Sequence, residues 1–404
     1  MVASEGDGNG WVVSESGDRR WGRFGAAGLL LRAADPTDPD VPLVLLQHRA
    51  VWTASGDTWA LPGGALDSHE DAAAAALRET EEEAEIRPAD VVVRAERVTS
   101  RMPGTVWHRP GLDMRHAALM LSRLRPDQKH TEVEDDRGVE DDRGDGTGVA
   151  APGTGAATPG TGAAAPGAGA ATPGAARRRP GIPPLVQVSG DPVEWTYTTV
   201  VADAPRPLAT VPNNESLELR WVPETRVADL PLMPAFAAAW ADGLRTEPVE
   251  LVVDVANVLG SRPDGWWKDR AGATTRLLDE LGEGMPRTLE IPAAAGTDFS
   301  RSPGGSPVSS ARAGNSVSGD APAPARFGWV ARAHAVIEGA ARAAEHAGPF
   351  VVRRATGEGD DSIVELATEL AGGPRRVVVV TADRGLRARL PRGVVVVGPR
   401  ALLG

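Results

Sequence analysis

The chain has 404 residues, of which 41% are hydrophobic and 24% charged, with a formal net charge of −12. This length allows two or three domains, and the lack of cysteine excludes disulfide scaffolds, thiolate zinc sites and cysteine nucleophiles. The acidic balance argues against a global nucleic-acid-binding surface, but not against an enzyme that binds nucleotides through a metal ion. No apolar run could cross a membrane and the polar N-terminus lacks a signal-peptide pattern, so a cytoplasmic protein without a membrane partner is expected.

Two low-complexity segments divide the chain. Residues 133–144 are a tandem repeat of Val-Glu-Asp-Asp-Arg-Gly, and Pro- and Gly-rich heptads follow from Pro152. Such a sequence cannot bury enough apolar surface to fold, so a disordered insertion is expected at about 104–190. A second segment, rich in Ser, Gly, Ala and Pro, is expected at about 296–325. The resulting division is a disordered tail over 1–19, a first domain over 20–245 and a second domain over 249–404.

The first domain alternates strand and helix patterns around one central helix. Ser68 followed by Asp71 resembles a capping box and predicts a helix over Ser68–Glu85. Before it, strands are expected at Phe24–Arg32 and Pro42–Gln47. After it, strands are expected at Asp90–Val98, Trp195–Ala202 and Leu217–Val222, with a closing helix at Pro234–Leu244.

The predicted helix carries an unusual set of acidic side chains. Glu79, Glu82 and Glu83 are spaced i, i+3 and i+4, which places them on one face of a helix, while a stripe including Leu77 and Thr80 would pack on the sheet. One alternative is a solvated acidic face. The five glutamates within 79–85 would then repel one another and oppose the dipole of the helix end. Because three carboxylates on one ridge suit Mg²⁺ or Mn²⁺, the metal-site interpretation is favoured.

The spacing around these glutamates resembles the Nudix box. The box places Gly, Glu, Arg-Glu and Glu-Glu at fixed intervals before a final Gly and an apolar residue. Two positions depart from it: Thr80 stands at an apolar position, and Glu85 stands where the box has the final Gly. Replacing that Gly is expected to cost ~1 kcal/mol and to shift the loop after the helix. The matching positions are Gly64, Glu70, Arg78, Glu79, Glu82, Glu83 and Ile86.

The resemblance to Nudix proteins implies a fold and an activity. The fold is an α/β/α sandwich with a mixed sheet, and the activity is Mg²⁺- or Mn²⁺-dependent cleavage of a diphosphate bond. Substrates are nucleoside diphosphates linked to another group: nucleoside triphosphates, oxidised triphosphates or nucleotide sugars. The resemblance leaves the general base open between one of the glutamates of the box and an acid from a distal loop. Glu215 and Glu218 are the distal candidates, although a surface role is favoured for each. The implied catalytic metal ligands are Glu79, Glu82, Glu83 and the Gly64 carbonyl, and the implied structural ion pair is Glu70 with Arg78.

The second domain alternates strands and helices, which predicts crossover units and a mainly parallel sheet. Its expected strands are Val249–Val255, Val330–Ile337, Pro349–Val352, Val377–Thr381 and Val394–Val397. Its expected helices are Lys268–Leu281, Asp361–Leu370 and Leu386–Leu390.

Aspartates stand at the carboxyl ends of two of these strands and at the start of one helix. The ends of parallel strands gather at one crevice, so Asp254 and Asp383 are expected to converge there, joined by Asp360 or Asp361 from the helix start. The pattern resembles a PIN-like domain of the NYN type, a three-layer fold found in metal-dependent ribonucleases, and RNA is the partner it implies. By that resemblance the metal ligands are Asp254, Asp360, Asp361 and Asp383, with Asn257 and Thr381 positioning the metal or a phosphate and Glu338 as a further acid.

The favoured interpretation is a Nudix hydrolase followed by a PIN-like ribonuclease domain, a combination of α/β and α+β architecture. Two alternatives stay open. One is a ribonuclease whose Nudix domain senses a nucleotide. The other is a non-catalytic, nucleotide-binding regulator in which Glu85 marks decay of the box. The presence of Glu79, Glu82 and Glu83 argues against the regulator.

Overall fold

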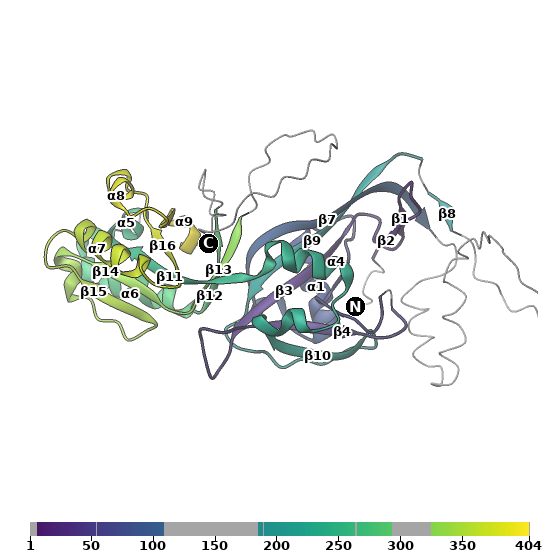
Figure 1. Ribbon diagram of the computed structural model, residues 1–404, viewed down its shortest axis with the longest axis horizontal. Helices are drawn as coiled ribbons and strands as arrows, with labels where there is room; N and C mark the ends of the chain where they lie inside the picture. The colour runs from purple at the N-terminus through teal and green to yellow at the C-terminus, as the bar shows by residue number, and fades with distance from the viewer. Residues whose placement is uncertain are drawn as a thin grey trace, which may run out of the picture.

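The computed structural model describes residues 6–53, 55–108, 185–188, 190–262, 265–292 and 325–403. Two sheets with their helices lie end to end along the long axis of the molecule (Figure 1). Most of the expected insertion at 104–190 and of the low-complexity segment at 296–325 lies outside the described residues. None of the described helices is long and apolar enough to span a bilayer.

The first sheet is mixed. Along its main path the strand order is β10-β4-β3-β9-β7-β1-β2. The β3–β9 pair is parallel, whereas the neighbouring pairs are antiparallel. The strands are β1 (Trp11–Val13), β2 (Arg19–Trp21), β3 (Ala26–Ala34), β4 (Pro42–Arg49), β5 (Trp59–Ala60), β6 (Gly63–Ala65), β7 (Val92–His108), β8 (Val186–Gln187), β9 (Val193–Asp203) and β10 (Ser216–Pro223).

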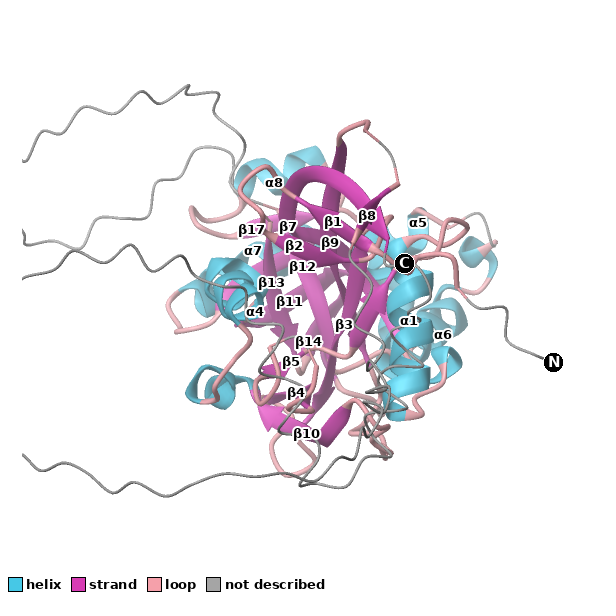
Figure 2. Ribbon diagram, turned by 90° about the vertical axis from the view of Figure 1, so that its right-hand side faces the viewer, coloured by secondary structure: helices cyan, strands magenta, loops and turns pink. Residues whose placement is uncertain are grey.

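Helices cover both faces of this sheet, as expected for an α/β/α sandwich. Alternate residues of β3 point to opposite faces, so Leu29 and Leu31 pack with the helix α1 (Ala72–Ala84), whereas Leu30 packs with Phe236. Phe236 belongs to α4 (Pro234–Ala239), which continues into the π-helical turn η4 (Trp240–Leu244). Figure 2 shows α1 and α4 on opposite sides of the strands. The short helices η1 (Pro88–Asp90) and η3 (Glu224–Asp229) complete this half.

The N-terminus differs from the expected disordered tail. Residues 11–13 and 19–21 form β1 and β2, and β1 extends the sheet by pairing with β7. The insertion is also shorter than expected at both ends, because β7 runs on to His108 and β8 follows at Val186. The tail prediction was wrong because β1 and β2 are each only three residues long, and the hairpin that they form joins the sheet through the pairing of β1 with the distant β7.

The start of α1 also differs from the prediction. The helix begins at Ala72, and the carboxylate of Asp71 caps it by accepting a hydrogen bond of 2.8 Å from the Ala74 N–H. Ser68 lies in the preceding turn, so the expected capping box is wrong. A carboxylate caps a helix as well as a hydroxyl does, so Asp71 can serve as the N-cap in place of Ser68.

The second sheet is mainly parallel, and its central strand β11 pairs in parallel with β13, β14 and β16. The expected strand at Val330–Ile337 is two strands separated by a bend, and β12 was not predicted. The strands are β11 (Thr246–Asp254), β12 (Arg287–Ile291), β13 (Arg326–Val330), β14 (Ala333–Ile337), β15 (Phe350–Arg354), β16 (Arg376–Val380) and β17 (Val395–Val397). The helices are α5 (Val255–Gly260), η5 (Trp266–Lys268), α6 (Arg270–Glu283), η6 (Gly339–Ala343), α7 (Gly359–Ala371), α8 (Arg384–Arg389) and α9 (Arg400–Leu403).

The antiparallel pair β12–β13 joins the two halves. Phe327 of β13 is 0% exposed and belongs to the same apolar cluster as Leu30 and Trp240 of the first half. The guanidinium of Arg97 lies 4.2 Å from the centroid of the Phe327 ring, a cation–π contact. In β12, Thr288 donates its N–H and its hydroxyl to the two carboxylate oxygens of Asp203, at 2.7 and 2.6 Å. Side chains of the second half therefore complete the core of the first.

Candidate active site

The strand β6 and the helix α1 lie close together at the site, so that Glu79 and Glu83 contact the backbone of β6. The N–H of Gly63 donates to a carboxylate oxygen of Glu83 at 2.8 Å. A Cβ added at Gly64 would lie 2.5 Å from the carboxylate carbon of Glu79. Any larger residue at 64 would therefore displace that carboxylate. The two glycines allow the backbone of β6 to approach both glutamates.

Arg78 organises the acidic residues that surround it. Its guanidinium forms two hydrogen bonds with Glu70, at 2.7 and 2.9 Å, and donates to the Ala65 carbonyl at 3.0 Å. It also donates to Glu79 at 2.7 Å, and it lies 3.5 Å from Glu82. These contacts lower the pKa of Glu70 and raise that of Arg78. Arg78 therefore ties the loop that carries Glu70 to the helix face that carries Glu79.

The three predicted metal-ligating glutamates differ in burial. Glu79 and Glu83 are 8% and 4% exposed, whereas the Glu82 side chain is exposed to solvent. Burial, and then the neighbouring charge of Glu79, raise the pKa of Glu83 to about 8. Two adjacent buried carboxylates repel each other unless a proton or a cation lies between them. The pair is therefore suited to a hard divalent cation.

Glu79 and Glu83 line a cavity of about 210 Å³, whereas Glu82 does not. Glu215, one of the two candidate bases, also lines it, and its charge contributes to the raised pKa of Glu83. Glu218 does not line it; its carboxylate forms two hydrogen bonds of 2.7 Å with Arg220. The remaining lining residues come from the N-terminal segment, from β4, β6 and α1 and from the loops between them: Gly6, Asn9, Trp11, Trp21, Arg49, Trp52, Thr53, Gly63, Gly64, Ala65, Asp67 and Arg78.

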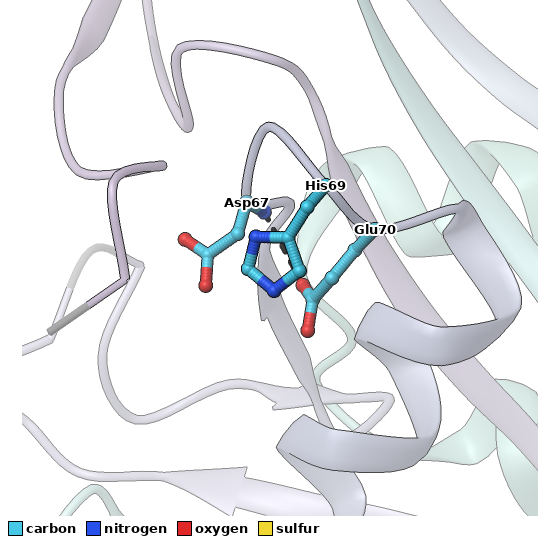
Figure 3. A group of neighbouring side chains, drawn as sticks. All are labelled: Asp67, His69 and Glu70. Atoms are coloured by element: carbon cyan, nitrogen blue, oxygen red, sulfur yellow. Dashed lines mark hydrogen bonds between the residues drawn. The ribbon is translucent and has the colours of Figure 1, made fainter. Parts of the chain in front are cut away.

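Asp67, His69 and Glu70 form a second group beside this cavity (Figure 3). Among the described residues, they are the three carboxylate or imidazole side chains whose ligand atoms all lie within 4.8 Å of one another. Both carboxylates already have partners, because Glu70 is held by Arg78 and Asp67 accepts the Gly8 N–H at 2.8 Å. The group is therefore engaged in holding the loop. Glu79, Glu82 and Glu83 are spread more widely than this.

The second predicted cluster lies at the carboxyl ends of β11 and β16. Asp254 is 7% exposed, and its two carboxylate oxygens accept hydrogen bonds from the Asn257 N–H, at 3.0 Å, and the Thr381 hydroxyl, at 2.8 Å. Asn257 in turn accepts the Ala382 N–H at 2.7 Å. Burial raises the pKa of Asp254, and the charges of Asp360 and Glu338 raise it further.

The acidic side chains of this second cluster line a cavity of about 250 Å³: Asp254, Glu338, Asp360 and Asp383. The pKa of Asp360 is raised by burial and by the charge of Asp383. Asp361 does not line the cavity, because its exposed carboxylate is paired with Arg389 of α8. Of the two aspartates expected as alternatives at the crevice, Asp360 lines it and Asp361 does not, although the resemblance implies both as metal ligands, because adjacent residues of a helix point about 100° apart.

The comparisons agree with the box and its geometry. A family model described as the NUDIX domain matches residues 23–142. The chain is 36% identical over 288 residues to "Putative 8-oxo-dGTP diphosphatase 3" of Mycobacterium tuberculosis strain H37Rv, an alignment that covers 71% of this chain and 82% of that protein. This chain belongs to the Nudix family. It is a hydrolase of the pyrophosphohydrolase class.

Further similarities are more local. Over 86 residues the chain is 48% identical to a nucleoside triphosphate pyrophosphatase/Nudix hydrolase fusion protein of Bifidobacterium longum, covering 21% of this chain and 18% of that protein. The crystal structure of the M. smegmatis Nudix hydrolase RenU is similar at 36% identity and a TM-score of 0.35, covering 58% of this chain and 91% of that one.

Glu85 shows how the Nudix helix ends without the glycine of the box. It adopts the left-handed conformation itself, with φ 56° and ψ 28°, and its N–H donates to the Glu81 carbonyl at 3.0 Å. The helix end is therefore kept, and the expected shift of the exit loop is not needed. The cost is the strain of a side chain in a backbone region that favours glycine.

Apart from Glu215, the cavity-lining residues outside the Nudix box were not predicted from the sequence. Trp11 and Trp21 line the cavity from the segment expected to be a tail. Arg49 lines it from the end of β4, and Gln47, a fully buried side chain of the same strand, contacts Glu83. Only pairing between distant strands brings these residues to the helix. A single signal was available, the two tryptophans flanking a short polar turn.

Proposed function

We propose that this Nudix hydrolase cleaves a diphosphate bond of a nucleoside triphosphate, with 8-oxo-dGTP as the first candidate and Mg²⁺ or Mn²⁺ as the cofactor. The observation that carries the proposal is the buried pair Glu79–Glu83, held opposite the Gly63–Gly64 backbone and beside Glu215 in one cavity. The name of the M. tuberculosis relative supports the choice of an oxidised purine nucleotide.

The donor set fits a hard cation. Glu79, Glu82 and Glu83 would hold it, together with the Gly64 carbonyl, since Mg²⁺ and Mn²⁺ prefer oxygen ligands. The raised pKa of Glu83 marks a place where a cation would replace a proton. When bound, the ion would neutralise the charge of the diphosphate and activate water for attack on phosphorus.

The residues of the chain supply orientation and proton transfer. The Gly63 N–H fixes one oxygen of Glu83, and Arg78 fixes one oxygen of Glu79, so both carboxylates are held before substrate arrives. Glu215 would accept the proton of the attacking water as general base. Arg49, on the same cavity, would contact the phosphates. The products are a nucleoside monophosphate and pyrophosphate.

The test is to incubate the protein and Mg²⁺ with ordinary triphosphates, 8-oxo-dGTP, dinucleotides and nucleotide sugars. The release of nucleoside monophosphate from each substrate is measured. We expect one triphosphate to exceed the rest and its turnover to be lost in Glu83→Gln. Glu218→Gln is the matched control, because Glu218 is paired with Arg220 away from the cavity. Equal turnover in Glu83→Gln and wild type would overturn the assignment.

A second candidate activity belongs to residues 249–404, which we infer to be a PIN-like domain that cleaves RNA. The supporting observation is the cavity lined by Asp254, Glu338, Asp360 and Asp383, with Asn257 and Thr381 fixing Asp254. Mn²⁺ or Mg²⁺ would again be held by the carboxylates. The test is cleavage of single-stranded RNA by the full chain, expected to be lost in Asp254→Asn and kept in Glu83→Gln.

A further inference from the structure

The N-terminal arm, residues 6–21, is fastened to the loop that leads into α1. The Gly8 N–H donates to Asp67 at 2.8 Å, and the Ser68 N–H donates back to Asp7 at 2.8 Å. A Cβ added at Gly8 would lie 2.1 Å from the Leu66 carbonyl oxygen, so only glycine allows this approach. At its other end the arm forms β1 and β2, which extend the sheet beside β7 (Figure 1). The arm is thus held from both sides.

Two tryptophans of the arm stand where two cavities meet. Trp11 and Trp21 are cross-strand partners whose ring centroids lie 5.1 Å apart in an edge-to-face arrangement. Both line the cavity of the acidic residues and a neighbouring cavity of about 420 Å³. Arg49, Gly63 and Gly64 also line both. The two cavities are therefore neighbouring parts of one site, with the arm along their shared wall.

The chemistry of the second cavity is that of a nucleoside pocket. Its lining includes the aromatic residues Trp195, Tyr197 and Phe236 and the hydroxyl-bearing residues Thr99 and Ser100. Flat aromatic walls bind bases by stacking, and a few hydroxyls can pair with base edges. Its volume lies in the range of about 300–1,000 Å³ that is usual for pockets of small organic ligands.

We propose that the N-terminal arm is the base-selecting element of this enzyme, with the indole of Trp21 stacking on a purine ring and Trp11, edge-on to Trp21, holding that indole in place. The proposal rests on the proposed hydrolysis of nucleoside triphosphates. With the phosphates at Glu79 and Glu83, the base of the same nucleotide would extend past Arg49 into the second cavity. A two-ring purine covers more of an indole than a pyrimidine does, so purine nucleotides are selected. Trp11 and Trp21 are specificity-determining residues and take no part in proton transfer.

The experiment is steady-state hydrolysis of dGTP, 8-oxo-dGTP and dCTP with Mg²⁺ by the full chain. In Trp21→Ala we expect KM for both purine substrates to rise roughly 5- to 100-fold, the value of one base–aromatic stack. We expect kcat to change by less than about threefold, because the variant loses binding and not chemistry. The preference for purine over dCTP should fall by the same factor as KM rises, and Trp21→Phe should restore most of it.

Two further variants keep the test decisive. Trp21→Leu retains apolar volume without an aromatic face and should behave like Trp21→Ala, with folding checked by thermal melting. Trp267→Ala is the control, because this tryptophan is 58% exposed and lies in the second half. Unchanged KM and purine preference in Trp21→Leu, with an active wild type, would overturn the role of the arm and leave the proposed function intact. A wild type that hydrolyses no triphosphate would overturn both.

Discussion

The two acidic sites of this protein use similar carboxylates in different surroundings. In the Nudix half, Glu79 and Glu83 are buried, an arginine fixes one of them, and aromatic rings line the adjoining cavity. In the second half, the described lining of the cavity around Asp254 is mostly acidic and aliphatic, and the nearby Arg389 holds Asp361 outside it.

The difference separates two parts of enzyme design. Carboxylates that raise one another's pKa occur at both sites, so they indicate suitability for a cation and nothing about the substrate. The walls carry the substrate information. Aromatic walls suit a single base, whereas an open acidic crevice suits a phosphodiester whose bases lie elsewhere. Predictions that separate the two sites therefore test this division directly.

The largest expected effect is on catalysis. Glu83→Gln should lower nucleotide hydrolysis by at least about 100-fold, because it removes one negative charge from the cation site. Asp254→Asn should leave nucleotide hydrolysis unchanged. Monophosphate release by the two variants, each checked for folding by circular dichroism, measures the contrast. If Asp254→Asn also abolished hydrolysis, the two sites would have to act as one.

The next effect is on stability across the contact between the halves. Phe327→Ala should destabilise the protein by about 3–5 kcal/mol, because it leaves a cavity in an apolar core and removes the partner of Arg97. Urea unfolding measures this. Val351→Ala is the control, since Val351 is an exposed residue of the second half. A loss no larger than that of the control would mean that the halves fold independently.

A smaller effect is expected on cation binding as pH changes. Below its pKa of about 8 the Glu83 carboxyl is protonated, and a cation must displace that proton. Mg²⁺ affinity should therefore rise about tenfold per pH unit up to pH 8 and level off above it. Calorimetric titrations between pH 6 and 9 test this. A constant affinity over that range would show that cation binding displaces no proton from Glu83, which would contradict its raised pKa.

The smallest effect concerns the end of α1. Glu85→Gly should stabilise the protein by about 0.5–1 kcal/mol, because glycine adopts the left-handed conformation without strain and removes an anion from the helix C-terminus. Glu81→Gly, an exposed position inside the same helix, should destabilise by about 1 kcal/mol. A higher melting temperature for Glu85→Gly and a lower one for Glu81→Gly would support this account. A lower melting temperature for both variants would contradict it.

Local patterns made much of this predictable. The spacing of Glu79, Glu82 and Glu83 fixes their placement on one helix, and the valine-rich runs fix the parallel strands around β11. The missed features depend on contacts between distant parts of the chain. The strand β1 of the N-terminal arm joins the sheet by pairing with β7. In the same way, β12 pairs with β13, which follows it after a long low-complexity segment. Likewise, the choice between Asp360 and Asp361 depends on how α7 packs on the sheet, which turns Asp360 and not Asp361 toward the cavity.

The position of Phe327 in the chain also affects the order in which the two halves can fold during synthesis. The ribosome delivers the chain from its N-terminus, and an N-terminal domain can fold during synthesis if its core is self-contained. Here the core of the Nudix half includes Phe327 of β13, and β13 is synthesised after β11, α6 and β12. A nascent chain that ends before Phe327 would expose Arg97 and the apolar cluster around Trp240. The core of the Nudix half is therefore complete only after much of the second half has been translated.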